Sequence, residues 1–295
     1  MRARFMELTF LTKLEKTNVN ASGTEGNITV LKKTEDIDGT QRVYISGASI
    51  KYAIKTYLSE LGWKLSPIKR KTKTAQITTQ CDEEKYIDDD LFGYMDTETD
   101  KKRIAPVKTN GMISIFPYKG DIDRGVRFDP EGKEHSMFDL EITTNVFRSN
   151  WAIELDRVGV IESENKELPA DEKNKRVKAL LTAILNLWSR VKQTNYLTKM
   201  SPDILVLVFR DDKTLTVGDK LRIDESYNLD IDALKEVLDY HKDGIKEVYI
   251  AGFGSFLNNW DELVKELNGY LDGKVKVMKL TEFKNLVLSE DFKFF

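Results

Sequence analysis

The chain has 295 residues, of which 40% are hydrophobic and 10% aromatic, so it can bury a full core and does not belong to the disordered class. Its single cysteine excludes an internal disulfide and a cysteine-based zinc site, so we expect a reducing, cytoplasmic location. The net charge is −3, and no apolar run approaches the length of a membrane span, so we expect no membrane partner.

Residues 4–16 alternate loosely between apolar and polar side chains, which predicts a first strand. Residues 17–40 form a long polar connection, in which residues 28–32 are expected to make a short hairpin arm. Connections of this length are uncommon in compact domains and are often functional.

The stretch 41–62, QRVYISGASIKYAIKTYLSELG, predicts a short strand, a turn of small residues and an amphipathic helix. Its apolar residues recur with the 3.6-residue period of a helix. Ser46 or Ser49 is the expected N-cap, and Gly62 the expected stop.

Lys51 and Lys55 lie four residues apart, on the polar side of this helix. Lys51 falls in the expected first turn, where a cation opposes the helix dipole. Such a choice suits an anion held by free backbone N–H groups, a serine hydroxyl and the lysine. The alternative is a solvated helix whose lysines only face water.

Charge is segregated along the middle of the chain. Residues 41–80 hold eight Lys or Arg against one acidic residue, whereas residues 81–100 hold nine acidic residues against one lysine. A nearly neutral protein can still bind polyanions if its basic residues share one face. Residues 64–103 therefore read either as a mobile surface subdomain or as a nucleic-acid contact. The run Asp88–Asp90 is interpreted as a solvated acidic patch rather than a metal site, because no ligand-spaced partner accompanies it.

The rest of the chain predicts alternating strands and helices, including a projecting hairpin and a long helix with Trp188 on its core-facing stripe. The order matches an α+β fold with a ferredoxin-like or RNA-recognition-motif core that carries insertions. The expected strands are 104–118, 146–161, 204–208, 248–250 and 275–280, and the expected helices are 171–192, 231–240 and 257–271.

Signatures of catalysis are missing. Neither histidine, His135 or His241, lies in a nucleophile motif, and there is no Walker loop. The segment AGFGSF at 251–256 lacks the third glycine of a dinucleotide-binding loop. We therefore predict no catalytic residue, no metal and no cofactor.

Five stretches, in order, carry a family resemblance: NVNASGTEGN, YISGASIKYAIK, DDDLFGYM, NWAIELDRVG and PDILVLVFR. Together they resemble the backbone subunit of the CRISPR Cascade complex, in the DevR-like branch of the seventh Cas family (the RAMP superfamily), over most of residues 1–215. The resemblance implies a hand-shaped protein with an RNA-recognition-motif-like palm. The palm would comprise 1–63, 104–118 and 145–295, with fingers at 64–103 and a β-hairpin thumb at 119–144.

The resemblance also implies which residues contact RNA. Lys51 matches the family's basic residue in the first palm helix, which contacts guide phosphates. The predicted RNA-binding residues are Asn18, Asn20, Arg42, Ser46, Ser49, Lys51, Lys55 and Lys108. The predicted thumb residues are Arg124, Arg127, Phe128, Met137 and Phe138.

The implied function is non-catalytic: a type I Cascade subunit, most like subtype I-B, that polymerises head to tail along the guide crRNA. Its partners would be the crRNA, target DNA through the guide, further copies of itself and other Cascade subunits. One alternative is a RAMP-superfamily ribonuclease, for which Asp36 or Asp38 could supply the carboxylate. Another is an interaction scaffold that binds no nucleic acid.

Overall fold

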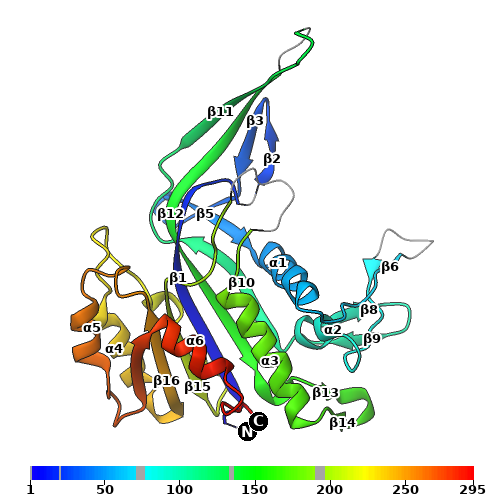
Figure 1. Cartoon of the computed structure of the whole chain (residues 1–295), viewed down its shortest axis with the longest axis vertical. Coiled ribbons are helices and arrows are strands. Elements are labelled where there is room, and N and C mark those ends of the chain that lie inside the picture. Colours follow the sequence, from blue (N-terminus) through cyan, green and yellow to red (C-terminus); the bar gives the residue numbers. More distant parts are fainter. Residues whose placement is uncertain (1, 20, 71–76, 133–135, 190–196) are drawn as a thin grey trace.

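The computed structural model describes residues 2–19, 21–70, 77–132, 136–189 and 197–295. The described chain is built on one large mixed sheet with the strand order β17-β16-β15-β1-β12-β10-β5-β4 (Figure 1). The bounds are β1 Phe5–Thr17, β4 Lys33–Glu35, β5 Gln41–Ser46, β10 Val107–Ser114, β12 Ser136–Glu154, β15 Ile204–Arg210, β16 Ile245–Gly252 and β17 Val275–Lys279. The prediction of a mixed α+β fold is confirmed.

The first predicted strand is confirmed as β1, which lies at the centre of the sheet. It pairs antiparallel with β12 on one side and β15 on the other. Neighbouring residues Phe10 and Leu11 point to opposite faces, and both side chains are fully buried. Both faces of the sheet are therefore covered at β1.

Helices cover the two faces to different extents (Figure 1). The first face packs against α1 Gly47–Glu60, α3 Ala170–Leu185 and α6 Leu280–Leu288. The second face packs against α4 Ile231–Tyr240 and α5 Trp260–Leu267. The buried core of the second face contains no residue of β5 or β10 within the described chain. The second face is therefore only half-covered around these two strands.

A hairpin projects from the sheet, and a short arm supports it (Figure 1). β11 Asp121–Arg127 pairs antiparallel with the first part of β12. Residues 146–154 of the predicted strand 146–161 thus belong to a longer strand that begins in the hairpin, but β12 ends at Glu154 and a 3-10 helix, Leu155–Arg157, follows it. The arm expected at residues 28–32 is present as β3 Ile28–Leu31, which runs parallel to β12, and its antiparallel partner β2 Ala21–Glu25 was not predicted.

The insertion between α1 and β10 contains α2 Ile87–Phe92, with β6 Lys69–Arg70, β7 Ile77–Thr78, β8 Tyr94–Asp96 and β9 Lys101–Arg103. The interpretation of Asp88–Asp90 as a solvated patch is wrong, because at most 3% of each residue is exposed. Asp90 accepts hydrogen bonds from Arg103 at 2.6 Å and from Arg176 at 2.8 Å. A buried carboxylate needs such partners, and these hold α2 against α3.

The long predicted helix 171–192 ends early. Asn186 leaves the helix after Leu185, and its side chain donates to the carbonyl of Thr182 at 2.7 Å. Trp188 is 41% exposed and forms a bridge with Lys199, so its assignment to the core is wrong. Val191 lies outside the described residues.

The C-terminal part extends the sheet. α4 has its predicted bounds, α5 is shorter than the expected 257–271, and α6 was not predicted. β16 and β17 are parallel and are joined through α5. The remaining elements are β13 Val160–Ile161, β14 Lys166–Glu167 and 3-10 helices at Leu155–Arg157, Glu162–Glu164, Gly218–Lys220 and Lys242–Gly244. Among the described helices, none is both long and apolar enough to cross a membrane.

Candidate nucleic-acid interface

The predicted turn before α1 forms a capped helix start. Ser46 is the N-cap, and its hydroxyl accepts a hydrogen bond from the backbone N–H of Ser49 at 3.3 Å. No acidic side chain occupies the first turn. Because the cap is Ser46 rather than Ser49, Lys51 lies one residue beyond the first turn. The charge of Lys51 therefore opposes the helix dipole less strongly than the sequence indicated.

Two glycines bring the start of α1 directly against β10. A Cβ on Gly47 would lie 2.6 Å from the carbonyl oxygen of Thr109. Gly111 has a φ of +96°, and a Cβ there would lie 1.9 Å from the carbonyl oxygen of Ile45. Contacts this short exclude any side chain without a backbone shift. The glycines therefore fix the position of the helix start on the sheet.

Lys51 carries a charge that no described residue compensates. The residue is partly buried, and burial lowers the pKa of its amine, with the neighbouring charge of Lys55 acting in the same direction. Within the described chain it makes no ion pair, and its Nζ lies 5.9 Å from the ring centroid of Phe92. A partly desolvated cation without a counter-ion costs folding free energy, which an anionic ligand would offset.

Lys55 has a different environment, although it lies one turn from Lys51. Its Nζ forms an ion pair with Asp88 at 3.0 Å, and it also lies 5.7 Å from the Phe92 ring centroid. The Asp88 side chain is only 4% exposed. Lys55 therefore ties α1 to α2, and its charge is already compensated.

Other predicted RNA-binding residues already have partners within the protein. The Arg42 guanidinium pairs with Asp36 at 2.5 Å and donates to the carbonyl of Ile115, also at 2.5 Å. Lys108 pairs with Glu154. Asn18 is 5% exposed and donates to a backbone carbonyl of β12 at 2.7 Å. Asn20 lies outside the described residues.

The projecting hairpin exposes apolar side chains. Phe128 is 71% exposed and Met137 76% exposed. Phe138 lies opposite Gly125 and covers it, since a Cβ on that glycine would lie 2.3 Å from the Phe138 ring. Arg124 approaches Asp139 at 3.6 Å. The Arg127 backbone pairs with Ser136, but its side chain is outside the described part of the structure.

The structure thus places Ser46, Ser49, Lys51 and Lys55 at the start of α1 and along it, whereas Asn18, Arg42 and Lys108 use their polar groups in contacts with other elements. Sequence reasoning missed Phe92 and Asp88, which set the surroundings of the two lysines. Both belong to the segment DDDLFGYM, but its acidic residues suggested a surface run. Only the packing of α2 against α1 shows otherwise.

Comparison with known proteins identifies related proteins and folds. Residues 8–227 match the family model described as "CRISPR-associated negative auto-regulator DevR/Csa2". No curated protein matches the chain.

Two solved structures share the fold over nearly the whole chain. A chain of a "CRISPR RNA-guided surveillance complex, pre-nicking" has a TM-score of 0.64 and 14% identity, covering 96% of this chain and 99% of that one. A chain of a "CRISPR RNA-guided surveillance complex" has a TM-score of 0.60 and 17% identity, covering 93% and 94%. At these identities the likeness concerns the fold. It extends beyond residue 227, where the family model stops.

Proposed function

The chain belongs to the CRISPR-associated DevR/Csa2 family, and on this premise we propose that it is the crRNA-binding backbone subunit of a type I Cascade complex, most like subtype I-B. Several copies would assemble head to tail along the guide spacer and present it for pairing with target DNA. The sheet with α1 and α3 would be the palm, residues 64–103 the fingers, and the β11–β12 hairpin the thumb.

The observation that carries this proposal is the uncompensated cation of Lys51 beside the capped start of α1. A guide-holding protein must accept any spacer sequence, so it should bind phosphate and sugar and leave the base edges free. A lysine, a serine hydroxyl and the backbone of a helix start provide such a site. Neither a lysine nor a backbone N–H distinguishes one base from another when it contacts phosphate.

The hairpin suits a wedge that displaces nucleotides. Its apolar side chains at Phe128 and Met137 are exposed, and apolar wedges can separate bases without reading their sequence. Repeated contacts between unlike surfaces of identical subunits produce open helical assemblies. A hairpin that projects away from the body of its own subunit can reach a neighbouring one.

The proposed role is structural rather than catalytic. The two carboxylates considered for RNA cleavage take part in local structure: Asp36 pairs with Arg42, and Asp38 accepts from the backbone N–H of Thr40 at 2.9 Å. That hydrogen bond is the main reason why the pKa of Asp38 is lowered. Both carboxylates stabilise the β4–β5 turn.

Co-expression with a guide RNA tests the proposal. We expect the wild-type protein to elute as a large particle that holds RNA of one defined length, with a high ratio of absorbance at 260 nm to that at 280 nm. Lys51→Glu should elute small and free of RNA. Lys265→Glu is the matched control, because Lys265 is exposed on α5, which packs on the opposite face of the sheet from α1, and its reversal changes the net charge equally.

A Lys51→Glu variant that loads RNA as well as the wild type would contradict the phosphate-binding role of Lys51. A wild-type protein that stays monomeric and free of RNA, even when the other Cascade subunits are present, would contradict the backbone function itself.

A further inference from the structure

The half-covered second face of the sheet carries a row of side chains that the proposed function does not use. Ile113 of β10 lies opposite Tyr44 of β5 on one side and opposite Arg148 of β12 on the other. Val43 and Ile45 point into the core beneath α1. Because side chains alternate along a strand, Tyr44 points to the opposite face.

A cavity of about 310 Å³ lies at the Tyr44 end of this row. Its volume falls within the range of small-ligand sites. Tyr44 and Ile113 supply an aromatic ring and an apolar side chain, and both are partly exposed. The cavity is lined by Lys33, Thr34, Tyr44, Asn110, Met112 and Ile113.

At the other end of the row, Arg148 has hydrogen-bonding capacity that is not used. Its Nη1 donates to the carbonyl of Asp219 at 3.1 Å, but its Nε is buried and has no partner among the described residues. Burial lowers the pKa of Arg148; Asp219 opposes this shift, whereas Arg42 and Arg222 reinforce it. Arg148 is therefore a third cation beside two other arginines.

The two neighbouring arginines already have counter-ions. Arg42 pairs with Asp36 and Arg222 with Asp230, whereas Arg148 makes no ion pair within the described chain. Arg148 as a whole is partly exposed, so an anion on this face can approach its guanidinium and offset a charge that no described residue pairs.

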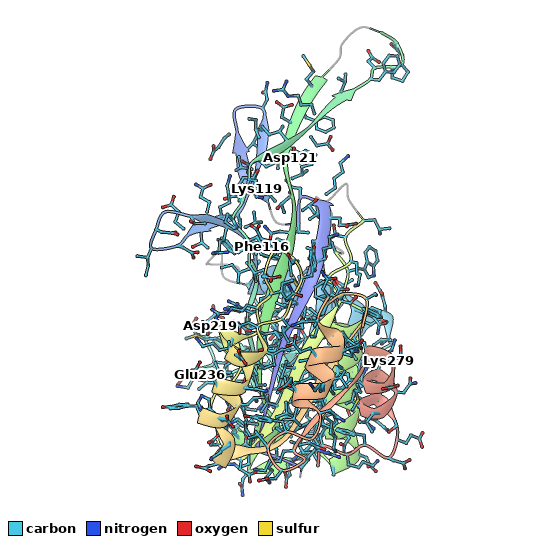
Figure 2. All side chains as sticks on the ribbon, turned by 90° about the vertical axis from the view of Figure 1, so that its left-hand side faces the viewer. Phe116, Lys119, Asp121, Asp219, Glu236 and Lys279 are labelled. Atoms are coloured by element: carbon cyan, nitrogen blue, oxygen red, sulfur yellow. The ribbon has the colours of Figure 1, made fainter. Side chains whose placement is uncertain are left out.

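α4 packs on the second face of the sheet. In Figure 2 the labelled residues Asp219, in the 3-10 helix Gly218–Lys220, and Glu236, in α4, lie on one side of the view, and Lys279, the last residue of β17 and the N-cap of α6, lies on the opposite side. Arg148 contacts Asp219, so the row lies on the α4 side. α1 and its Lys51 belong to the opposite face.

We propose that this open sheet face is a second binding site for single-stranded nucleic acid, with a base stacked on Tyr44 beside Ile113 and a backbone phosphate at Arg148. Aromatic rings on a sheet surface stack bases whatever their identity. A guanidinium presents planar donors that match phosphate geometry. Tyr44 and Arg148 stand two strand spacings apart, about 10 Å, so one short stretch of a single strand can contact both.

The strand held here is a further part of the guide RNA, because Tyr44 lies only two residues before Ser46, the cap at which the proposed function places guide phosphate; the identity of the strand rests on that function. Fluorescence anisotropy with labelled RNA and DNA oligonucleotides of the same sequence tests this, and tighter binding of DNA than of RNA would contradict it. Measurements use the full chain, in the wild-type and Lys51→Glu backgrounds.

In the Lys51→Glu background we expect residual binding that Tyr44→Ala weakens about 5- to 150-fold, the range of one base–aromatic stack. Tyr44→Phe should retain it, because the ring is kept. Arg148→Gln should weaken it for every sequence. Ultraviolet crosslinking of an oligonucleotide that contains 5-bromouridine should label the peptide that contains Tyr44.

Unchanged affinity in Tyr44→Ala, together with the absence of that crosslink, would overturn the inference. So would an Arg148→Gln variant that loses only self-association, because the cation would then serve a protein partner. If Tyr44→Ala weakens oligonucleotide binding while Lys51→Glu does not, the result supports this second site and contradicts the proposed role of Lys51. Matching melting temperatures of Tyr44→Ala and Tyr44→Phe verify that folding is intact.

Discussion

Two neighbouring regions of the molecule differ in whether their buried charges have counter-ions. Where α2 meets α3, Asp90 is fully buried and pairs with Arg103 and Arg176, whose side chains are 2% and 3% exposed. At the start of α1, Lys51 is partly buried and makes no ion pair with the described residues. The first arrangement holds the fold together. The second leaves a charge available for a ligand.

We expect the largest loss of stability where Asp90 pairs with Arg103 and Arg176. Asp90→Ala leaves two buried guanidinium groups without their carboxylate, so we expect a loss of about 3–5 kcal/mol in the free energy of unfolding. Asp171→Ala, on the exposed first turn of α3, is the control and should cost less than about 1 kcal/mol. Urea unfolding measures both. Equal losses in the two variants would contradict the claim that the buried ion pairs of Asp90 contribute to the free energy of unfolding.

The next effect tests the geometry of the α1 start. Gly111→Ala should destabilise the protein by about 3 kcal/mol, because a non-glycine residue is strained at this φ and its Cβ overlaps the Ile45 carbonyl. Gly120 also has a positive φ, but a Cβ there would lie in open space. Gly120→Ala therefore measures the cost of backbone strain without the steric overlap. A Gly111→Ala variant as stable as Gly120→Ala would contradict the close approach.

A smaller effect should distinguish the two lysines of α1. Lys55→Ala leaves the buried carboxylate of Asp88 without its ion pair and should cost about 2 kcal/mol. Lys51→Ala removes a partly desolvated cation that no described residue pairs, so it should leave stability unchanged or raise it slightly. Thermal unfolding of both variants measures the difference. A destabilised Lys51→Ala would show that this lysine has a structural partner.

The smallest expected effect is the loss of stability caused by Glu154→Gln, which should depend on pH. Burial acts to raise the pKa of this carboxyl, but hydrogen bonds from Lys108 and Lys213 outweigh burial and hold it at about 2. The folded state therefore favours the ionised form. Its contribution is present above the unfolded pKa of about 4.5 and is lost as the pH falls towards 2.

Glu154→Gln should consequently cost no more than about 1 kcal/mol at pH 7, since the partner lysines are half-exposed. Denaturant unfolding at pH 7, 4 and 2.5 should show the two proteins converging in stability at low pH. A constant difference at all three values would contradict the lowered pKa.

Local patterns in the sequence predicted the elements that form along one stretch of chain. The strand β1 and the helices α1 and α4 follow from periodicity and capping, and the segment of β3 was expected as an arm, whereas its partner β2 was taken as part of a polar connection. α3 was predicted too long, because the apolar period continues past Asn186, where the backbone leaves the helix.

The candidate site could be predicted only in part. Ser46 and Lys51 stood out because the helix start and the lysine are adjacent in sequence. The burial of Asp88–Asp90 could not be predicted, because Arg103 and Arg176 are far from them in sequence and an acidic run resembles a solvated surface. Arg42 was singled out as a basic residue, yet its pairing with Asp36 depends on the β4–β5 turn.

The central claim is that Lys51 binds RNA phosphate, and the salt dependence of RNA affinity tests it most directly. The logarithm of the binding constant should be measured against the logarithm of salt concentration for the wild type, Lys51→Ala and Lys265→Ala, on several RNA sequences. We expect Lys51→Ala alone to reduce the slope by about one unit and to weaken binding uniformly across sequences. An unchanged slope, or a loss confined to particular sequences, would contradict the account.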